Sequence, residues 1–434
     1  MLELSGNAQM KSAEMSASDP RDKLARPSRL PRAIGLACSL LVVGAAAYFG
    51  YLWLAPPNIY EGPLLQRAEP DSVTLVWYLS KAAECEFDVS TPDGKIVPHT
   101  LMHDGLRYVA AVAGLTADTA YKYEIRLNRQ TACTAALHTA KRPGQPFDFV
   151  VFGDSGRGSK EQYRLAAVMA ATSPDFLLHT GDLVYPAGKR SDYHERFFKP
   201  YAEMTRSIAF WPCLGNHDIA EPGFGAAYRE VFELPDNGPR GLKPEHNYWF
   251  DYASARIAVL DSNLGPDDLE KSVAPWLRSV FQDSNARWKF VAFHHPPYTT
   301  GKHQPSLDVQ RALVPAFEAV GVDVVFCGHD HLYERTRPLR AGNSVESGGV
   351  TYIVSGAGGA ELYETKPPAD RPDYFVSVFN EKHSFTLVTI NGDALVGKQI
   401  TIDGRTIDDW TIIRPPGIPT TTPTPATASA PAGG

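Results

Sequence analysis

The chain has few cysteines and no excess of basic charge. Five cysteines in 434 residues are too few for a scaffold built on disulfides. The formal net charge is −7, whereas a nucleic-acid-binding face usually carries a basic stripe, so we expect no nucleic-acid partner. Hydrophobic residues make up 43% and aromatic residues 11% of the chain. That composition allows more than one domain with a packed core.

Long hydrophobic runs are also scarce, and one segment near the N-terminus stands out. Residues 33–60 contain no charged residue, and a helix from Ile34 to Leu54 is long enough to cross roughly 30 Å of hydrocarbon. Basic residues precede this run, so the positive-inside rule predicts a transmembrane anchor over 33–56, with a disordered cytoplasmic tail over 1–32 and the rest of the chain outside the cytoplasm. The alternative is a signal peptide cleaved at Ala45-Ala46-Ala47, which would make the protein secreted.

Short alternating runs follow the anchor, over residues 57–143. Examples are Ser72–Trp77, Arg107–Ala110 and Tyr121–Ile125, with a Pro92-Asp93-Gly94 turn between two of them. Short strands at regular spacing indicate a β-sandwich. The stretch Leu115–Tyr123 resembles the end of a fibronectin type III domain. Two of the cysteines, Cys85 and Cys133, lie here, and the sequence leaves open whether they form a disulfide.

The pattern changes over residues 144–414. Phe147–Phe152, Phe176–Leu178, Ile257–Leu260, Phe290–Phe293 and Val322–Phe326 are nearly continuous apolar runs, as expected of strands covered on both faces. Ser159 and Gln162 predict a capping box that opens a helix over Tyr163–Ala171. We therefore expect an α/β or α+β domain with mixed sheets flanked by helices. The Pro/Thr-rich segment 415–434 is expected to be disordered.

Five short motifs in this domain carry potential metal ligands, and each lies in or just after an apolar run. Strand ends converge on one crevice in α/β sheets, and glycines beside the ligands allow a close approach to an ion. The donors are carboxylates, a phenol, an amide and imidazoles, a set that suits iron, zinc or manganese. The motifs are Gly153-Asp154-Ser155-Gly156, Gly181-Asp182-Leu183-Val184-Tyr185, Gly215-Asn216-His217-Asp218, Val291-Ala292-Phe293-His294 and Gly328-His329-Asp330-His331.

These motifs, in this order, resemble those of purple acid phosphatases within the calcineurin-like metallophosphoesterases. The likeness extends from about Phe147 to Ile413, and small sandwiches like that of 57–143 precede the catalytic domain in plant-like members. The resemblance implies a binuclear centre with one metal held by Asp154, Tyr185 and His331. It implies a second metal held by Asn216, His294 and His329, with Asp182 bridging the two. A phenolate ligand favours Fe(III), so we expect Fe(III) paired with divalent iron, zinc or manganese.

The resemblance also implies a reaction. A metal-bound hydroxide would attack a phosphate ester, with His217 and His303 as catalytic residues that assist the leaving group or bind substrate. The expected function is an acid phosphatase acting on phosphate monoesters. Alternatives are a phosphodiesterase acting on nucleotides or lipid headgroups and, from another class, a non-catalytic membrane-tethered binding module. The sequence does not define the natural substrate or the oligomeric state.

Several neighbouring residues receive simpler interpretations. His295 is expected to point away from the site, His179 to be a hydrogen-bonded core residue, and His246 to be structural or exposed. Asp330 is expected to support the ligand loop. Glu334 and Arg335 are expected to pair with each other or to orient ligands, and Gly356-Ala357-Gly358-Gly359 to form a tight turn without the spacing of a phosphate loop.

Overall fold

The computed structural model describes residues 54–282 and 284–414. The chain divides into two compact units, residues 1–56 and 57–434, and the predicted anchor, 33–56, lies almost wholly outside the described residues. Among the described residues, no helix is long and apolar enough to cross a membrane. The segments 1–32 and 415–434 also lie outside them.

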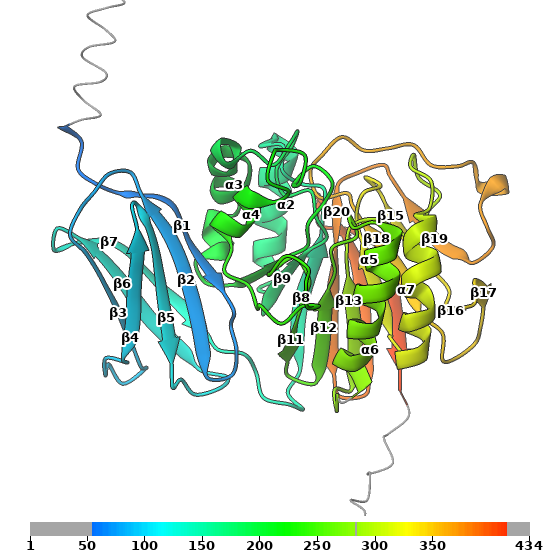
Figure 1. Ribbon diagram of the computed structural model, residues 1–434, viewed down its shortest axis with the longest axis horizontal. Coiled ribbons are helices and arrows are strands. Elements are labelled where there is room, and N and C mark those ends of the chain that lie inside the picture. Colours follow the sequence, from blue (N-terminus) through cyan, green and yellow to red (C-terminus); the bar gives the residue numbers. More distant parts are fainter. Residues whose placement is uncertain (1–53, 283, 415–434) are drawn as a thin grey trace, which may run out of the picture. The chain divides into compact units, whose positions relative to one another are not determined.

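The first part of the second unit is a β-sandwich, as predicted (Figure 1). Its two sheets have the strand orders β1-β2-β5-β4 and β3-β6-β7. These are the ABED and CFG orders of a constant-type immunoglobulin domain; a closer relationship to fibronectin type III domains remains a prediction. The strands are β1 (Ile59–Gln66), β2 (Ser72–Leu79), β3 (Cys85–Ser90), β4 (His99–Asp104), β5 (Arg107–Ala113), β6 (Ala120–Leu127) and β7 (Gln130–His138).

The sandwich settles the possible disulfide. Cys85 on β3 lies opposite Leu127, and Cys133 on β7 lies opposite Ile125, with β6 between them. Two strand spacings are about 9.6 Å, beyond the roughly 7 Å that a disulfide can span between Cα atoms. Both cysteines are free.

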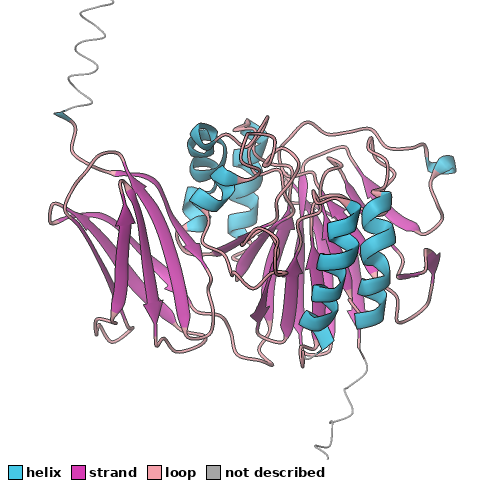
Figure 2. Ribbon diagram, viewed as in Figure 1, coloured by secondary structure: helices cyan, strands magenta, loops and turns pink. Residues whose placement is uncertain are grey.

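The second part of this unit contains two large mixed sheets with helices on their outer faces (Figure 2). The six-stranded sheet has the order β10-β9-β8-β20-β21-β22, and the seven-stranded sheet has the order β11-β12-β13-β14-β18-β15-β19. Its strands are β8 (Phe147–Phe152), β9 (Phe176–His179), β10 (Ala209–Pro212), β11 (Tyr248–Tyr252), β12 (Ala255–Val259), β13 (Trp288–Ala292), β14 (Val324–Cys327), β15 (Tyr333–Thr336), β18 (Thr351–Ser355), β19 (Phe375–Phe379), β20 (Ser384–Asn391), β21 (Ala394–Thr401) and β22 (Thr406–Ile413); a small hairpin pairs β16 (Leu339–Arg340) with β17 (Asn343–Ser344).

The helices are short and distributed along the chain. Figure 1 shows α6 and α7 in front of the seven-stranded sheet. The helices are α2 (Lys160–Ala171), α3 (Lys199–Thr205), α4 (Ala226–Val231), α5 (Pro266–Asp268), α6 (Ala274–Gln282) and α7 (Leu307–Val320), and the irregular turns are η1 (Arg190–Asp192), η2 (His194–Phe198), η3 (Leu269–Val273) and η4 (Pro368–Asp370).

The apolar runs are buried on both faces because side chains alternate along a strand. In β13, Phe290 packs in the core between the sheets, where its ring lies 5.5 Å from that of Phe149 on β8. The next residue, Val291, packs with α6 and α7 through Leu277 and Phe317. The prediction of strands covered on both faces is therefore confirmed.

The predicted capping box is only partly present. The Ser159 hydroxyl accepts a hydrogen bond from the Gln162 amide at 3.1 Å and caps α2, which begins at Lys160. The Gln162 side chain accepts from the Gly158 amide at 2.7 Å instead of from Ser159, and donates to the Arg196 carbonyl at 2.8 Å. This side chain thereby ties the start of α2 to η2.

Candidate metal centre

The predicted ligands come together where strands of both large sheets end. Asp154, Asp182 and Asn216 follow β8, β9 and β10 of one sheet, while His294, His329 and His331 follow β13 and β14 of the other. Asp154, Asp182 and His329 have φ of 56°, 57° and 71°, a left-handed conformation that is uncommon for non-glycine residues and easier for Asp and His than for most. The sharp turns aim the side chains into the space between the strand ends.

One half of the site contains Asp154, Tyr185 and His331. The Tyr185 hydroxyl lies 3.3 Å from Asp154 Oδ1 and 2.9 Å from His331 Nε2, and His331 Nε2 lies 3.6 Å from Asp154 Oδ1. His331 Nδ1 donates to the Glu361 carbonyl at 2.5 Å. Because a carbonyl only accepts, Nδ1 carries the proton and Nε2 keeps a lone pair for a metal.

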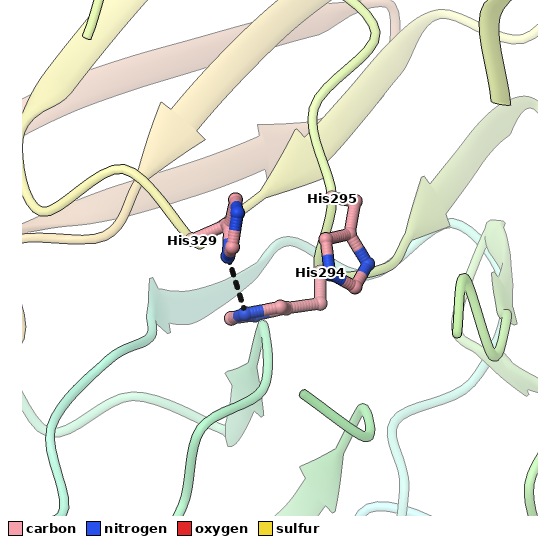
Figure 3. A group of neighbouring side chains, drawn as sticks. All are labelled: His294, His295 and His329. Atoms are coloured by element: carbon pink, nitrogen blue, oxygen red, sulfur yellow. Dashed lines mark hydrogen bonds between the residues drawn. The ribbon is translucent and has the colours of Figure 1, made fainter. Parts of the chain in front are cut away.

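The other half contains Asn216, His294 and His329. His294 Nδ1 donates to the Thr180 carbonyl at 2.9 Å, so His294 Nε2 faces the site, with a lone pair available when the imidazole is neutral. That Nε2 atom lies 3.0 Å from Asn216 Oδ1 and 3.2 Å from His329 Nδ1, the pair joined by the dashed line in Figure 3. Asp182 Oδ2 lies 3.5 Å from the same atom.

Among the described residues, the buried carboxylates of Asp154 and Asp182 have no lysine or arginine as an ion-pair partner. Asp154 and Asp182 are 0% and 1% exposed, and within residues 54–282 and 284–414 their ion-pair partners are histidines: His294, His331 and His217. Burial raises the pKa of Asp154; burial opposes ionisation of Asp182 too, but the charge of His294 holds the pKa of Asp182 below its usual range. Two acids buried side by side need further positive charge, so the donor set fits metal cations.

Tyr185 supports the same conclusion. The ring is 1% exposed, and burial together with the charges of Asp154 and Asp182 raises the pKa of its hydroxyl well above 10. A phenolate forms here only if a cation offsets that charge. Tyr185 therefore fits a metal ligand better than a titrating group.

Glycines leave room around the two carboxylates. A Cβ at Gly215 would overlap the Asp182 side chain, and one at Gly356 would lie 2.8 Å from Asp154 Oδ2. The Gly356–Gly359 segment is more than the tight turn expected from sequence. The Gly358 amide donates to the Gly153 carbonyl at 3.0 Å and the Ala360 amide to the Asp154 carbonyl at 2.8 Å, so the loop after β18 holds the backbone that carries Asp154.

Both predicted catalytic histidines lie at the site. His217 Nδ1 donates to the Pro186 carbonyl at 2.5 Å, and its Nε2 lies 3.9 Å from Asp182 Oδ2 with the side chain 35% exposed. The His303 ring centroid lies 4.0 Å from that of His329, and the His303 amide donates to Asp330 Oδ1 at 2.9 Å. Asp330 also accepts from the Thr299 hydroxyl at 2.6 Å, consistent with its expected support of the loop.

The structure decides three expectations for neighbouring residues: His295 differs from its expectation, while His246 and Glu334 with Arg335 each follow one of their alternatives. His295 does not point away: its ring centroid is 4.6 Å from that of His329, and one nitrogen each of His294, His295 and His329 lie within 4.8 Å of one another (Figure 3). His246 is 3% exposed and pairs with Asp261 at 3.0 Å. Glu334 and Arg335 do not pair; strand alternation sends Glu334 to the Thr300 amide at 2.9 Å and Arg335 to Asp408 at 2.8 Å.

His179 agrees with its expected structural role. Its Nε2 pairs with the Ser155 hydroxyl at 2.8 Å, and its Nδ1 accepts from the Gly181 amide at 3.2 Å. Burial lowers its pKa to about 3, so it stays neutral. With both nitrogens engaged, it bridges two ligand loops and has no lone pair left for an ion.

Other residues at the site were not identified from sequence. Asp218 accepts hydrogen bonds from the Leu183 amide at 2.9 Å and the Gly215 amide at 2.8 Å, joining two ligand loops. Tyr363 stacks on the His331 ring, with centroids 3.9 Å apart. The Arg157 guanidinium lies 4.4 Å from the centre of the Tyr185 ring. The position of Asp218 directly after His217 in its motif could have identified it from sequence. No sequence pattern points to Tyr363 or Arg157.

Comparisons with known proteins show which families this chain is similar to. Residues 147–333 match the calcineurin-like phosphoesterase family. Purple acid phosphatase 18 of Arabidopsis thaliana is 27% identical over 297 residues, which is 65% of this chain and 64% of that protein. An uncharacterized protein of Mycobacterium tuberculosis is 27% identical over 53% of this chain and 51% of its own length. The chain thus spans about half to two thirds of the length of these relatives.

A solved structure shows the same fold over a larger share of the chain. The purple acid phosphatase PPD1 from yellow lupin seeds superposes with a TM-score of 0.70 at 18% identity, covering 83% of this chain and 74% of that one. Residues 147–333 thus match the calcineurin-like phosphoesterase family, and the chain shares the fold of a purple acid phosphatase. In sequence, the chain is also similar to acid phosphatases of plants and mammals.

Proposed function

We propose that this chain hydrolyses phosphate monoesters with a binuclear metal centre. The observation that carries the proposal is the buried pair Asp154 and Asp182, surrounded by histidine, tyrosine and asparagine donors without a lysine or arginine ion-pair partner among the described residues. Asp154, Tyr185 and His331 would hold Fe(III); Asn216, His294 and His329 would hold divalent iron, zinc or manganese; Asp182 would touch both. Bound there, the cations would neutralise charge on the phosphoryl oxygens and lower the pKa of water.

The residues of the chain have distinct tasks in this proposal. The Glu361 and Thr180 carbonyls fix the tautomers of His331 and His294, so each presents Nε2 to the centre. His217 is held through Nδ1 by the Pro186 carbonyl, which leaves its Nε2 to carry the proton for the departing alcohol. His303, beside His329, would hydrogen-bond the substrate.

The test combines spectroscopy with a pair of substrates. Purified protein is expected to show a broad visible band from tyrosinate to iron and about two metals per chain. It should hydrolyse p-nitrophenyl phosphate faster than bis(p-nitrophenyl) phosphate. Tyr185→Phe should lose the band. A colourless zinc or manganese protein would overturn the iron assignment, faster diester hydrolysis would favour the phosphodiesterase, and absence of metal would favour the binding module.

The location of the protein remains a prediction from sequence. A membrane tether over 33–56 with the catalytic domain outside the cytoplasm, or secretion after cleavage, would both place the centre where phosphate esters are met outside the cell. Protease accessibility of the catalytic domain in intact cells distinguishes an external from an internal location.

A further inference from the structure

A cavity of about 270 Å³ is lined by residues that include near neighbours, along the chain, of the candidate metal centre. Its walls come from the segment that follows His217, the loop that precedes β11 and the segment that follows β12. Apolar side chains supply one part and polar side chains another. The apolar lining includes Ile219, Phe224, Leu242 and Leu264, and the polar lining includes His246 and Asn263.

The cavity adjoins the centre because the same segments build both. Ile219 follows His217 by two residues. Asn263 Nδ2 donates to the Leu214 carbonyl at 3.3 Å, just before the Gly215-Asn216 motif. The preceding residue, Ser262, pairs through its hydroxyl with His295 Nδ1 at 2.9 Å, and His295 in turn lies against His329.

The polar part of the wall has buried atoms without partners. His246 Nδ1 pairs with Asp261 Oδ2 at 3.0 Å, but His246 Nε2, Asn247 Nδ2 and Asn263 Oδ1 have no hydrogen bond within the described part of the chain. All three belong to residues that line this cavity. Buried polar atoms are almost always paired, so three orphans among the residues of one wall indicate a polar partner there, which a water or a ligand can supply.

The rim offers an aromatic face. Phe224 is 64% exposed and lies between Gly223 and Gly225, with all three residues at positive φ. Lys243 Nζ donates to the Gly223 and Phe224 carbonyls at 3.1 and 3.0 Å and lies 5.0 Å from the centre of the Phe224 ring. This contact holds a large apolar side chain at the cavity mouth, where a planar group can stack on it.

The size of the cavity limits the occupant. At about 270 Å³ it exceeds the roughly 150 Å³ that accommodates benzene in an engineered protein cavity and falls just below the roughly 300 Å³ at which drug-sized pockets begin. A single ring with polar substituents fits this volume. A small polyol would leave the apolar wall uncovered.

We propose that this cavity is the leaving-group subsite, and that the preferred substrates are phosphate monoesters of alcohols with one aromatic or heteroaromatic ring. The inference rests on the proposed function for the position of the phosphoryl group. The ring would lie against Ile219, Leu242 and Leu264, with its polar edge toward Asn263 and its face toward Phe224.

The test uses phosphonates, which bind without turnover. Metal-loaded protein should bind phenylphosphonate at least about tenfold more tightly than methylphosphonate, the discrimination expected of an apolar pocket. Leu264→Trp, which fills the cavity, should remove that preference while metal content and methylphosphonate affinity stay unchanged. Ile413→Trp places the same side chain at a position 67% exposed and away from the lining residues, and should preserve the preference.

Equal affinities in the unaltered protein, or a preference that survives Leu264→Trp, would overturn the subsite. If Leu264→Trp fails to fold, Ile219→Trp fills the cavity from the opposite segment and is judged by the same criterion. Because binding is read without turnover, a phenylphosphonate preference in a protein that hydrolyses no phosphate ester would refute the proposed function and the leaving-group role, and would leave a cavity that binds an aromatic ring.

Discussion

The sandwich and the metallophosphoesterase domain differ in where they bury polar groups. In the sandwich the buried side chains are mostly apolar, and two exceptions, Glu61 and Gln66, face the other domain. Glu61 pairs with Arg190, and Gln66 accepts from the Glu233 amide at 2.8 Å. The metallophosphoesterase domain instead buries several carboxylates and histidines together at the candidate centre, and others, such as Asp323, elsewhere. In both domains, part of the buried polarity lies at contacts with segments that carry or flank the site.

The sandwich also contacts segments that lie close to the candidate centre along the chain. Tyr78 donates to the Glu230 carbonyl at 2.7 Å, and Arg107 pairs with Glu233 at 2.7 Å. Glu230 and Glu233 lie at the end of α4, which follows the Phe224 loop, while Arg190 follows Tyr185 by five residues. The sandwich therefore braces the loops around the centre and contributes none of the proposed ligands.

The largest effect should come from the carboxylate placed between the two halves of the centre. Asp182→Ala should lose both metals and reduce turnover by at least about 100-fold, because charge stabilisation in the transition state disappears. Elemental analysis and phosphatase assays measure this. Asp323→Ala removes another buried carboxylate, paired with Arg414, and should keep both metals. Retention of metal by Asp182→Ala would refute the bridging role.

The next effect concerns proton transfer. His217→Gln should slow turnover by about 10²–10⁴-fold and leave the metals bound, because His217 belongs to neither ligand set. Turnover and metal content measured on the same sample separate the two roles. An unchanged rate would remove this histidine from the mechanism.

A smaller effect concerns Glu334 of the metallophosphoesterase domain, which should make the free energy of unfolding depend on pH. Burial raises the pKa of Glu334 from 4.5 to about 7, so the folded state holds this proton more tightly than the unfolded state. The stabilisation is present below pH 4.5 and is lost as the pH rises through 7, a decline of at most about 3 kcal/mol in the free energy of unfolding. Glu334→Gln should flatten that decline in urea unfolding between pH 4.5 and 8; an unaltered slope would contradict it.

The smallest effect should come from the interface. Glu61 is 3% exposed and its removal leaves Arg190 without one of its two carboxylate partners, so Glu61→Gln should lower the free energy of unfolding by about 1–3 kcal/mol. Glu86→Gln breaks the more exposed pair with Arg126 and should cost about 1 kcal/mol or less. Equal losses in the free energy of unfolding for the two variants would show that the interface pair stabilises the protein no more than the exposed pair does.

The sequence predicted features that depend on neighbours along the chain. Alternation along the strands predicted the sandwich and the two-sided burial of Phe290 and Val291. The predicted ligands converge because the motifs follow strands whose carboxyl ends meet. Boundaries were less accurate: α2 begins at Lys160, three residues before the predicted start, because Ser159 is its cap.

Features made by distant segments were not predictable from one sequence. The loop at Gly356 packs on Asp154 some 200 residues away, and His246 finds Asp261 on another strand end. His295 was misplaced because alternation alone sends it opposite to His294; the chain leaves the strand at Ala292, so alternation no longer applies there. A periodic pattern cannot encode such contacts.

The two halves of the candidate centre each take ligands from both large sheets. Asp154, Tyr185 and Asn216 follow strands of one sheet, whereas His294, His329 and His331 follow strands of the other. Ion occupancy and sheet packing would then be thermodynamically linked, because an ion that binds only the assembled form stabilises it. Metal supply in the surroundings would thus set the lifetime of the folded protein as well as its activity, and chelation would act as a denaturant.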